Sequence, residues 1–524
     1  MVRRPNSQNF AVRQPIISPS FSSWSTDSAA EMLKDLFRRK TMDQLVAEAE
    51  QPEHRLKKAL GPVDVTALGI GAIIGAGIFA TIGTAAAGDP TRPGAGPGLI
   101  LSFIFTAVAC GFAALCYAEF AAMIPISGSA YTYAYATLGE LIAWIIGWDL
   151  IIEYAVGNVA VAISWGNYFK TLISGFGISV PDWMSTDYRT AARIPGLFDR
   201  APHVFGVPIV FNVLAFAIVA VITIVLVIGI RESATVNTTM VLLKLIVLGF
   251  FVAVGWSYIK SANFHPLLPN GWAGVQAGAA IVFFAYIGFD AVSTVAEETR
   301  RPSRDLPVGI IGSLLISTVV YILVAAVFIG IIPFDVLRQK LATEQAEPLT
   351  MALQYANIEK WGDLFVGIVA FGSVVAHTAV LLVFQLGQPR IFFSMARDGL
   401  LPQSFAKVHP RFRTPHVTTI LTGVAVAVCA MFTSIDEMVD LTNIGTLFAF
   451  ILVCLGILVL RKREPHRPRV FRTPWSPVTP ILGIASCIYL MMGLPAITWI
   501  RFALWLVVGM FVYFSYGFRR SRLR

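Results

Sequence analysis

Long runs of hydrophobic residues separated by short polar stretches make up most of the chain after about residue 63. Each run is long enough to cross the hydrocarbon core of a bilayer as a helix, which takes roughly 17–25 residues. The pattern predicts an all-α polytopic membrane protein with twelve transmembrane helices, at residues 64–87, 97–123, 141–169, 206–229, 236–259, 273–296, 308–332, 363–387, 416–433, 438–460, 478–496 and 499–517.

The composition agrees with this pattern. Of the 524 residues, 56% are hydrophobic and only 14% are charged, whereas charged residues make up about a quarter of a soluble domain. The net charge of +9 therefore relates to membrane topology, and we expect no nucleic-acid partner. The five cysteines lie in or beside apolar runs without metal-ligand spacing, which predicts no disulfide and no metal site.

The positive charges predict an orientation. With an even number of spans, 29 of the 40 Lys and Arg residues lie on the side that holds both termini, and ten lie on the opposite side. Loops rich in Lys and Arg stay in the cytoplasm, so we expect both termini there. No signal-peptide core precedes the first span, which we expect to be retained.

The chain divides into three parts. Residues 1–60 are expected to form a cytoplasmic N-terminal segment, partly disordered, with an interfacial helix after residue 25 that serves either as a lid or as a passive tail. Residues 61–460 hold spans 1–10, which are expected to form the core, and residues 461–524 hold the last two spans and a short basic tail.

Two spans carry signs of a broken helix. The first contains four closely spaced glycines, and Gly288 and Asp290 interrupt the sixth, 211 residues after Gly77. Paired interruptions at corresponding positions of two halves point to a transporter site at the membrane midplane. Freed N–H groups near Gly75 would suit a carboxylate and freed C=O groups near Ala285 an ammonium. The alternative is that these glycines only allow close helix packing.

Three stretches resemble a known family: GIGAIIGAGIF at 69–79, FFAYIGFDAVSTVAEETRRPSRDLPVGI at 283–310 and GQPRIFFSMARDGLLP at 387–402. They are similar to the amino acid, polyamine and organocation (APC) transporter superfamily, and most similar to the bacterial relatives of the cationic amino-acid transporters. The resemblance covers about residues 35–515. It implies a 5+5 inverted repeat, the leucine-transporter-like fold, with two peripheral helices, and secondary transport of amino acids across the bacterial inner membrane.

The resemblance also implies site residues. Phe289 resembles an aromatic residue that gates the site, and Ala76 stands where many relatives have Thr or Ser, so a hydroxyl contact is lost there. The implied contacts to the substrate head group are Ile73, Ile74, Gly75, Ala76 and Gly77 in span 1 and Phe284, Ala285, Tyr286 and Ile287 in span 6. Asp290 is expected to cap the second half of span 6, accepting from the N–H of Val292 or Ser293.

Lys244 lies in the middle of span 5, where a charged side chain costs about 2.5–3.5 kcal/mol or more on insertion scales. By resemblance to proton-coupled relatives, its ammonium takes the place of a sodium ion and bonds to freed carbonyls of span 1. Thr378, and secondarily Ser373, are expected to offer hydroxyls to it. The alternative is that Lys244 has only a structural role and holds neighbouring helices together.

Glu153 in span 3 is expected to border the substrate cavity or to handle protons, and His377 in span 8 to tune selectivity or to titrate. In both cases the alternative is a structural hydrogen bond. We assign no role to Asp149, one turn before Glu153.

Taken together, these features predict a proton-coupled amino-acid symporter that works by alternating access. No nucleotide-binding or hydrolase motif occurs, so we expect no enzyme activity and no cofactor. The alternatives are an amino-acid or polyamine exchanger and a membrane sensor that binds without transport. The expected partners are the amino acid, protons and lipid. A small accessory membrane subunit, the oligomeric state and the preference for cationic or neutral substrates stay open.

Overall fold

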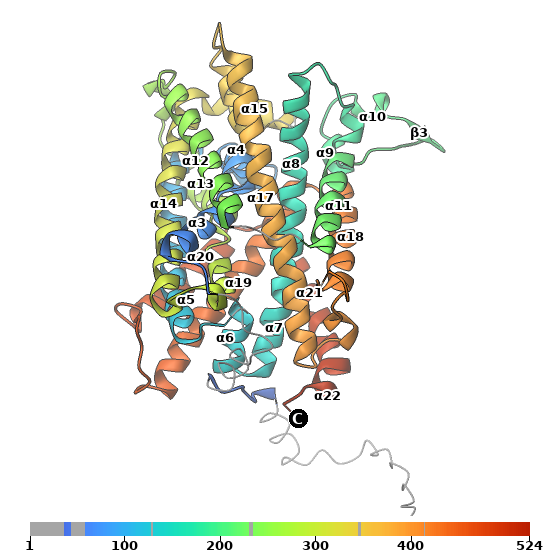
Figure 1. Cartoon of the computed structure of the whole chain (residues 1–524). Helices are drawn as coiled ribbons and strands as arrows, with labels where there is room; N and C mark the ends of the chain where they lie inside the picture. Colours follow the sequence, from blue (N-terminus) through green and yellow to red (C-terminus); the bar gives the residue numbers. More distant parts are fainter. Residues whose placement is uncertain are drawn as a thin grey trace, which may run out of the picture.

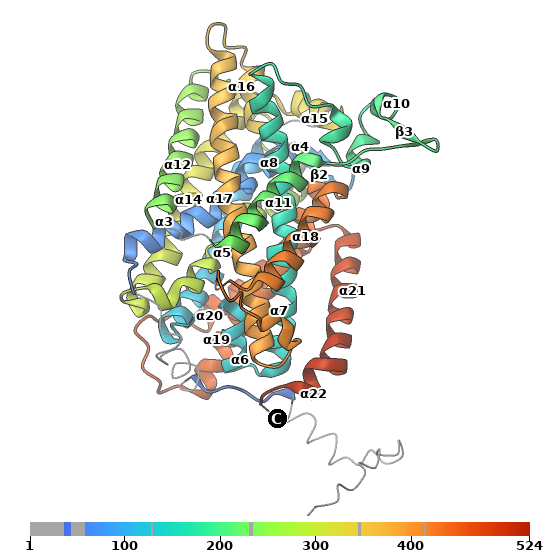
Figure 2. The same ribbon diagram turned by 45° about the vertical axis from the view of Figure 1, so that its right-hand side comes forward.

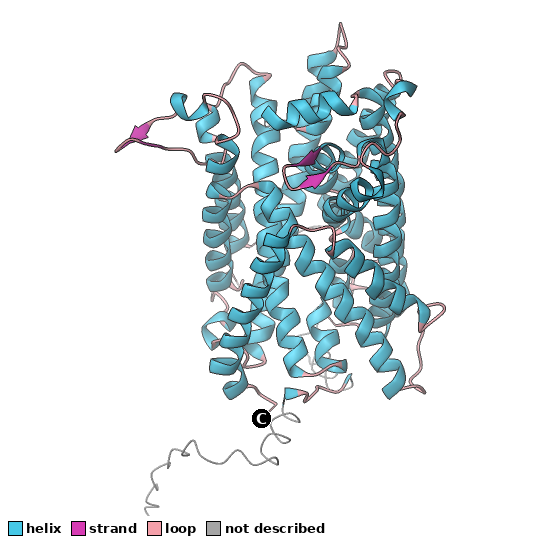
Figure 3. Cartoon of the chain, turned by 180° about the vertical axis from the view of Figure 1, so that it is seen from behind, coloured by secondary structure: helices cyan, strands magenta, loops and turns pink. Residues whose placement is uncertain are grey.

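The computed structural model describes residues 36–42, 58–126, 129–229, 234–343, 347–412 and 414–523. Within these residues the chain is a bundle of helices that run mostly side by side, together with two short hairpins, β1 (Gly88–Asp89) with β2 (Arg92–Pro93) and β3 (His203–Val204) with β4 (Val207–Pro208) (Figures 1 and 3). The prediction of an all-α fold is confirmed.

The helices up to the middle of the chain are α3 (Pro62–Ile73), α4 (Ile82–Ala87), α5 (Leu99–Met123), α6 (Ser129–Thr137), α7 (Glu140–Ile151), α8 (Gly157–Ser174), α9 (Tyr188–Ala191), α10 (Leu197–Arg200), α11 (Val213–Ile228) and α12 (Ala234–Trp256). The later helices are α13 (Gly271–Val282), α14 (Pro302–Ile331), α15 (Phe334–Thr343), α16 (Pro348–Tyr355), α17 (Gly362–Arg397), α18 (His416–Phe432), α19 (Ile435–Arg463), α20 (Val478–Met491), α21 (Ala496–Val512) and α22 (Phe518–Arg520).

In the part of the chain that the structure describes, nine helical segments are long and apolar enough to cross a membrane: Pro62–Ala87, Gly96–Met123, Glu140–Ser174, Thr238–Trp256, Gly271–Glu298, Pro302–Ile331, Gly362–Arg397, Ile435–Arg463 and Ala496–Arg520. Three shorter apolar helices, Val213–Ile228, His416–Phe432 and Val478–Met492, coincide with the three remaining predicted stretches. The chain is a multi-pass membrane protein.

The outer surface of the bundle supports this assignment. Large apolar side chains stand exposed along α11, α12, α14 and α21, among them Val221, Ile224, Leu242, Ile246, Leu315, Val319, Leu504, Val507 and Phe511. Apolar surface of this extent is unfavourable in water, but it matches the hydrocarbon of a bilayer.

The structure departs most from two of the predicted boundaries. The fourth stretch was predicted to begin at residue 206, but α11 begins at Val213, because the Asn212 side chain accepts from the Ala215 N–H at 3.0 Å and caps the helix there. The eighth stretch was predicted to end at residue 387, but α17 continues through Pro389 to Arg397. Proline is tolerated inside membrane helices where neighbouring groups replace the lost hydrogen bond.

The segment before α3 is joined to the far end of the sixth span. The Leu60 N–H donates to the Glu298 carbonyl at 3.0 Å, the Arg300 N–H donates to the Leu60 carbonyl at 2.9 Å, and Leu60 and Thr299 form a parallel bridge. These bonds hold two segments that are far apart in sequence at one end of the bundle.

The short N-terminal piece 36–42 lies at the end of the bundle that also holds α6 and α22 (Figure 2). The Glu140 N–H donates to the Arg38 carbonyl at 2.9 Å, and Lys40 pairs with Asp398 at 2.9 Å. The interfacial helix predicted after residue 25 falls largely outside the described residues.

Candidate functional site

The first span is broken in its middle, as its glycines predicted. α3 ends at Ile73, and Ile74 takes an extended conformation with φ −78° and ψ 102°. The chain then forms one wide turn over Gly77–Thr81 before α4 begins. A Cβ atom at Gly75 would lie 2.5 Å from a methyl group of Val380, so helix α17 packs directly against the break.

The sixth span is broken as well. α13 passes into a tight 3-10 turn over Phe283–Tyr286, Ile287 is extended with ψ 136°, and a second 3-10 segment runs over Asp290–Glu298. Gly288 has a φ of +120°, which side chains other than hydrogen rarely allow. A Cβ atom there would also lie 2.8 Å from the backbone of Ala72, so the glycine lets the two broken spans touch.

The two breaks face each other. A Cβ atom at Gly77 would lie 2.1 Å from the Cα atom of Ala285, which shows how closely the backbones approach. The structure therefore brings the expected head-group residues of the two spans together, and all nine are buried. Phe289 is buried beside them, with its ring centroid 5.9 Å from that of Tyr117 and 5.0 Å from that of Phe450.

Tyr321 joins the two breaks, and the sequence reasoning missed it. Its hydroxyl lies 3.0 Å from the Ile73 carbonyl and 2.8 Å from the Ala285 carbonyl. It can donate its proton to only one of them at a time. The Ala285 carbonyl was expected to accept a hydrogen bond from the substrate ammonium. It already has a possible donor within the protein. A tyrosine in the middle of the apolar seventh stretch was the available signal.

Lys244 reaches the first break from α12. Its ammonium donates to the carbonyls of Gly71 and Ile74, each at 2.8 Å, and the side chain is fully buried. Both acceptors lie where α3 loses its helical hydrogen bonds, and an ammonium satisfies them without water. The predicted contact between Lys244 and span 1 is confirmed.

The predicted contact between Thr378 and Lys244 is wrong. The Thr378 hydroxyl donates to the Val374 carbonyl at 2.7 Å and accepts from the Trp165 indole N–H at 2.9 Å. Thr378 therefore points toward α8, and no hydrogen bond joins it to Lys244 among the described residues.

His377 is held by hydrogen bonds on both sides of its ring. Nδ1 lies 2.7 Å from the Ser373 carbonyl, which can only accept, so Nδ1 carries the proton. Nε2 lies 2.7 Å from the Ser164 hydroxyl, and the ring packs against Phe79 and Tyr168. This arrangement matches the structural alternative for His377. The Ser373 hydroxyl, the second one considered for Lys244, lies 3.2 Å from Nδ1, and no hydrogen bond joins it to Lys244 among the described residues.

Three buried carboxyl groups lie close together near the two breaks. Glu153, in a wide turn over Ile152–Val156, is 3% exposed and close enough to Asp149 and Asp290 for their charges to interact. Asp149 packs against the backbone of Gly445. Two ionised carboxyls in such a place repel each other, and a proton or a substrate ammonium relieves that repulsion.

Asp290 does not form the predicted cap. Both of its carboxyl oxygens are buried and have no hydrogen-bond partner among the described residues. The Val292 N–H donates to the Phe289 carbonyl instead, at 3.3 Å. The tight turn that follows Gly288 supplies backbone acceptors for these N–H groups, so the side chain is not needed as a cap.

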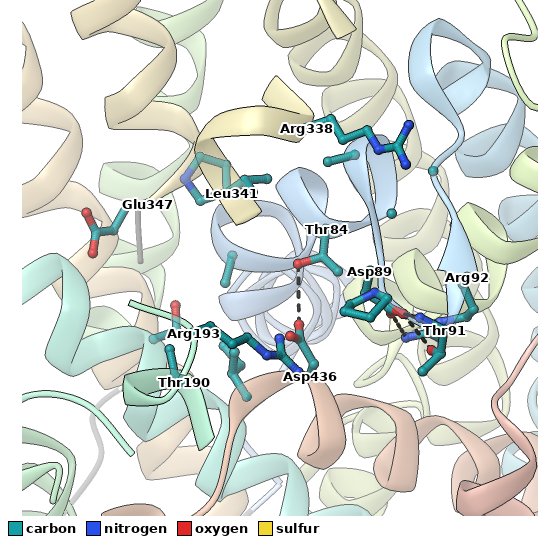
Figure 4. Close-up of a pocket in the computed structure, with 18 of the residues that line it drawn as sticks. Thr84, Asp89, Thr91, Arg92, Thr190, Arg193, Arg338, Leu341, Glu347 and Asp436 are labelled. Carbon is teal, nitrogen blue, oxygen red and sulfur yellow. Dashed lines mark hydrogen bonds and ion pairs between the residues drawn. The ribbon is translucent and has the colours of Figure 1, made fainter. Parts of the chain in front are cut away.

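A cavity of about 730 Å³, here called the vestibule, lies beside α4 and the β1–β2 hairpin (Figure 4). These elements lie toward the end of the bundle opposite α22 (Figure 2). Charged side chains of both signs surround it, including Asp89, Arg92, Arg193, Arg338, Glu347 and Asp436. At its edge the Arg92 guanidinium pairs with Asp89 at 2.8 Å and with Asp440 of α19 at 2.8 Å.

Arg92 keeps Asp89 ionised. Burial would raise the pKa of Asp89, but the attraction of the Arg92 guanidinium and hydrogen bonds from Thr91 and Arg92 outweigh it and hold that pKa below its usual value. Asp89 therefore remains a carboxylate in mildly acidic medium. Its contribution to stability is present above the ordinary aspartate pKa and is lost only as the pH falls through the lowered value.

Two broken spans that face each other in an apolar bundle, with a buried lysine at one break, are features of helical membrane transporters. Comparison with known proteins agrees: residues 60–514 match the amino acid permease family, and the chain belongs to this family within the APC superfamily.

Its curated relatives are transporters. The branched-chain amino acid permease BcaP of Bacillus subtilis (strain 168) is 46% identical over 94% of this chain and its own whole length. The methylthioribose transporter of the same organism is 42% identical with the same coverage. The vacuolar cationic amino acid transporter 4 of Arabidopsis thaliana is 37% identical over 83% of this chain and 68% of its own length.

Replacing Gly77 by alanine should destabilise the protein, because the added methyl group collides with the Ala285 backbone. Overpacking of this kind costs about 1–3 kcal/mol. Thermal unfolding of the purified protein measures the effect. Gly111→Ala is the matched control, because a Cβ atom there meets nothing within 4 Å. Equal melting temperatures for the two variants would contradict the close approach of the breaks.

Replacing His377 by glutamine should leave the pH dependence of transport unchanged, although it lowers stability. The imidazole is held between the Ser373 carbonyl and the Ser164 hydroxyl, so we expect it to have a structural role. Uptake in liposomes between pH 5 and 8 measures this. A displaced pH profile with normal expression would show that His377 titrates during transport.

Proposed function

We propose that the protein is a secondary amino-acid transporter that couples uptake to an inward flow of protons and works by alternating access. The observation that carries the proposal is the ammonium of Lys244 on the carbonyls of Gly71 and Ile74. A resident cation at this break leaves no need for sodium there, and its protonation can couple the break to the proton gradient.

The substrate head group binds between the breaks. Backbone N–H groups of span 1 around Gly75 receive the carboxylate, and carbonyls of span 6 between Phe284 and Ile287 receive the ammonium. Tyr321 exchanges between Ile73 and Ala285 and can release one carbonyl when substrate arrives. Phe289 closes the site towards Tyr117.

Neutral amino acids with branched side chains are the proposed substrate class. A branched-chain amino acid permease is 46% identical over the whole of its length, and the apolar residues Ile73, Ile74 and Phe284 surround the breaks. The three carboxyl groups near the breaks, those of Glu153, Asp149 and Asp290, would attract a cationic side chain if they were ionised. We propose that a proton held by these three carboxyl groups excludes cationic substrates. We also propose that Glu153 takes part in proton transfer.

The membrane arrangement is part of the proposal. We infer twelve spans, with the three shorter apolar helices completing the nine long ones. Spans 1–5 and 6–10 form two inverted halves, each beginning with a broken helix, and spans 11 and 12 are peripheral. Both termini lie in the cytoplasm of a bacterial cell, and the vestibule opens to the outside.

Uptake of labelled leucine by the purified protein in liposomes tests the proposal. An inward proton gradient should drive accumulation, unlabelled isoleucine and valine should compete, and arginine should not. Flux that needs internal amino acid but no gradient would identify an exchanger instead. Binding of leucine without any flux would identify a sensor.

Lys244→Ala should reduce gradient-driven leucine uptake to the level seen without a gradient, because it removes the proton-carrying group at the break. Thermal stabilisation by leucine shows whether the variant still binds substrate. Lys170→Ala is the control, because this lysine pairs with Asp182 near the surface. Undiminished gradient-driven uptake by Lys244→Ala would overturn the role of this lysine in coupling.

A further inference from the structure

We propose that the tip of the β3–β4 hairpin, residues 204–207, inserts into the lipid interface beside the bundle and anchors the loop that forms one wall of the vestibule. The partner is the headgroup and upper acyl region of the leaflet on the vestibule side. The inference rests on the twelve-span arrangement proposed above, but it is independent of the transported substrate and of proton coupling.

The loop between α8 and α11 is a small folded unit that carries α9, α10 and the β3–β4 hairpin. It has an apolar cluster of its own, separate from the main core, in which Trp183, Ile194 and Phe198 pack on the buried side chains of Ala191, Leu197, Ala201 and Val210. The same loop lines the vestibule with Thr190, Arg193 and Ile194. The position of this loop therefore decides the shape of the vestibule.

The tip of the hairpin takes no part in this apolar cluster. Phe205 is fully exposed, and Val204 and Val207 are 49% and 58% exposed. No Asp, Glu, Lys or Arg occurs in the tip sequence HVFGVP, residues 203–208. Neighbouring apolar side chains at such a place are unfavourable in water. We therefore expect a contact that removes them from water.

The turn at the tip also indicates a role for Phe205. Phe205 and Gly206 are its two central residues, because Val204 pairs with Val207, and their φ values are +52° and +79°. A turn with two positive φ values favours Asn, Asp or Gly. An aromatic residue costs free energy there, because its Cβ atom crowds the following carbonyl. A residue in such a conformation points to a contact made elsewhere by its side chain.

The hairpin lies at the level where the lipid-facing surface begins. The Asn212 N–H donates to the Met431 carbonyl at 3.0 Å, so the first turn of α11 is held against the last turn of α18. From these ends, exposed apolar side chains run along both helices, among them Phe216, Ile224, Val428 and Phe432. The hairpin ends at Pro208, a few residues before Asn212, and therefore stays close to this boundary.

The hairpin also points in the direction of the lipid. It projects sideways from the bundle in three views (Figures 1, 2 and 3). A tip that leaves the bundle sideways at the level of the helix ends meets the bilayer, whereas a tip directed along the helix axes would meet water. Phenylalanine is among the side chains that bury favourably at the boundary between headgroups and acyl chains. This burial offsets the cost of the turn.

A strand from another protein is a less suitable occupant. β3 and β4 are only two residues long, Pro202 precedes β3, and Pro208 ends β4. Proline has no N–H to donate to a neighbouring strand. Short edge strands and edge prolines are features that prevent pairing with another chain. The geometry therefore favours lipid as the partner of the tip.

Spin-label accessibility tests the anchor in the full-length protein, reconstituted in vesicles of phosphatidylethanolamine and phosphatidylglycerol. In a Cys429→Ser background, where the other four cysteines are buried, a nitroxide is attached to Val204→Cys, next to Phe205. The measured quantity is the ratio of its collision rate with oxygen, which concentrates in lipid, to that with a water-soluble nickel complex. Ile224→Cys on the exposed face of α11 is the lipid reference, and Thr190→Cys in the vestibule is the water reference.

The ratio at Val204→Cys should approach the lipid reference. Phe205→Asn should lower it to near the water reference, because Asn suits the turn but gives up apolar burial that favours the inserted form about tenfold or more. Phe205→Trp should keep the ratio high, since tryptophan is favoured at membrane interfaces. Phe176→Asn is the matched control, because Phe176 is also a highly exposed aromatic residue beyond a helix end, and it should leave the ratio unchanged.

Several results would overturn the proposal. A ratio at Val204→Cys as low as the water reference would show that the tip lies in water. Low collision rates with both reagents would show that protein covers the tip, and magnetic broadening between labels on two molecules would identify that protein as a second copy. A ratio that Phe205→Asn leaves unchanged, or that Phe176→Asn lowers equally, would also refute the role of Phe205.

The reference positions separate this proposal from those it rests on. A water-like ratio at Ile224→Cys would refute the membrane arrangement and the anchor with it. A lipid-like ratio at Val204→Cys in a protein that takes up no leucine would leave the anchor standing and refute the transport function. Normal leucine uptake together with a water-like tip would refute the anchor alone.

Discussion

Backbone polar groups that lose their helical partners inside an apolar bundle must find others, and this constraint organises the centre of the molecule. Lys244 supplies donors to the carbonyls of Gly71 and Ile74, and Tyr321 supplies one to Ile73 or Ala285. These side chains come from α12 and α14, so the breaks in two spans depend on two further helices. The same backbone groups can also bind a substrate, because an amino-acid head group carries the complementary charges.

Much of the fold followed from the hydrophobic pattern. Each of the twelve predicted apolar stretches coincides with an apolar helix, and the breaks lie at Ile74 and Ile287, next to the glycines that predicted them. Glycine marks these positions because a Cβ atom would collide with the facing backbone. The charge of Lys244 in the middle of an apolar span predicted a polar partner, and the resemblance to proton-coupled relatives placed that partner at the first break.

Other features could not be predicted from local pattern. The Arg92–Asp440 pair joins residues 348 positions apart, and only the packed helices show that they meet. Thr378 was assigned to the wrong neighbour, because neighbouring residues of a helix point about 100° apart and small errors in rotation change the partner. The expected cap by Asp290 failed because the backbone of a 3-10 turn satisfied the same N–H groups.

The bridge between Leu60 and Thr299 has a mechanical consequence. The same two segments also touch where a Cβ atom at Gly69 would lie 2.9 Å from Val292, and where Gly288 lies against Ala72. The termini-side halves of the two broken spans are thus fastened at three levels along their length. Because of these contacts we expect the two halves to tilt together about the two breaks and not separately.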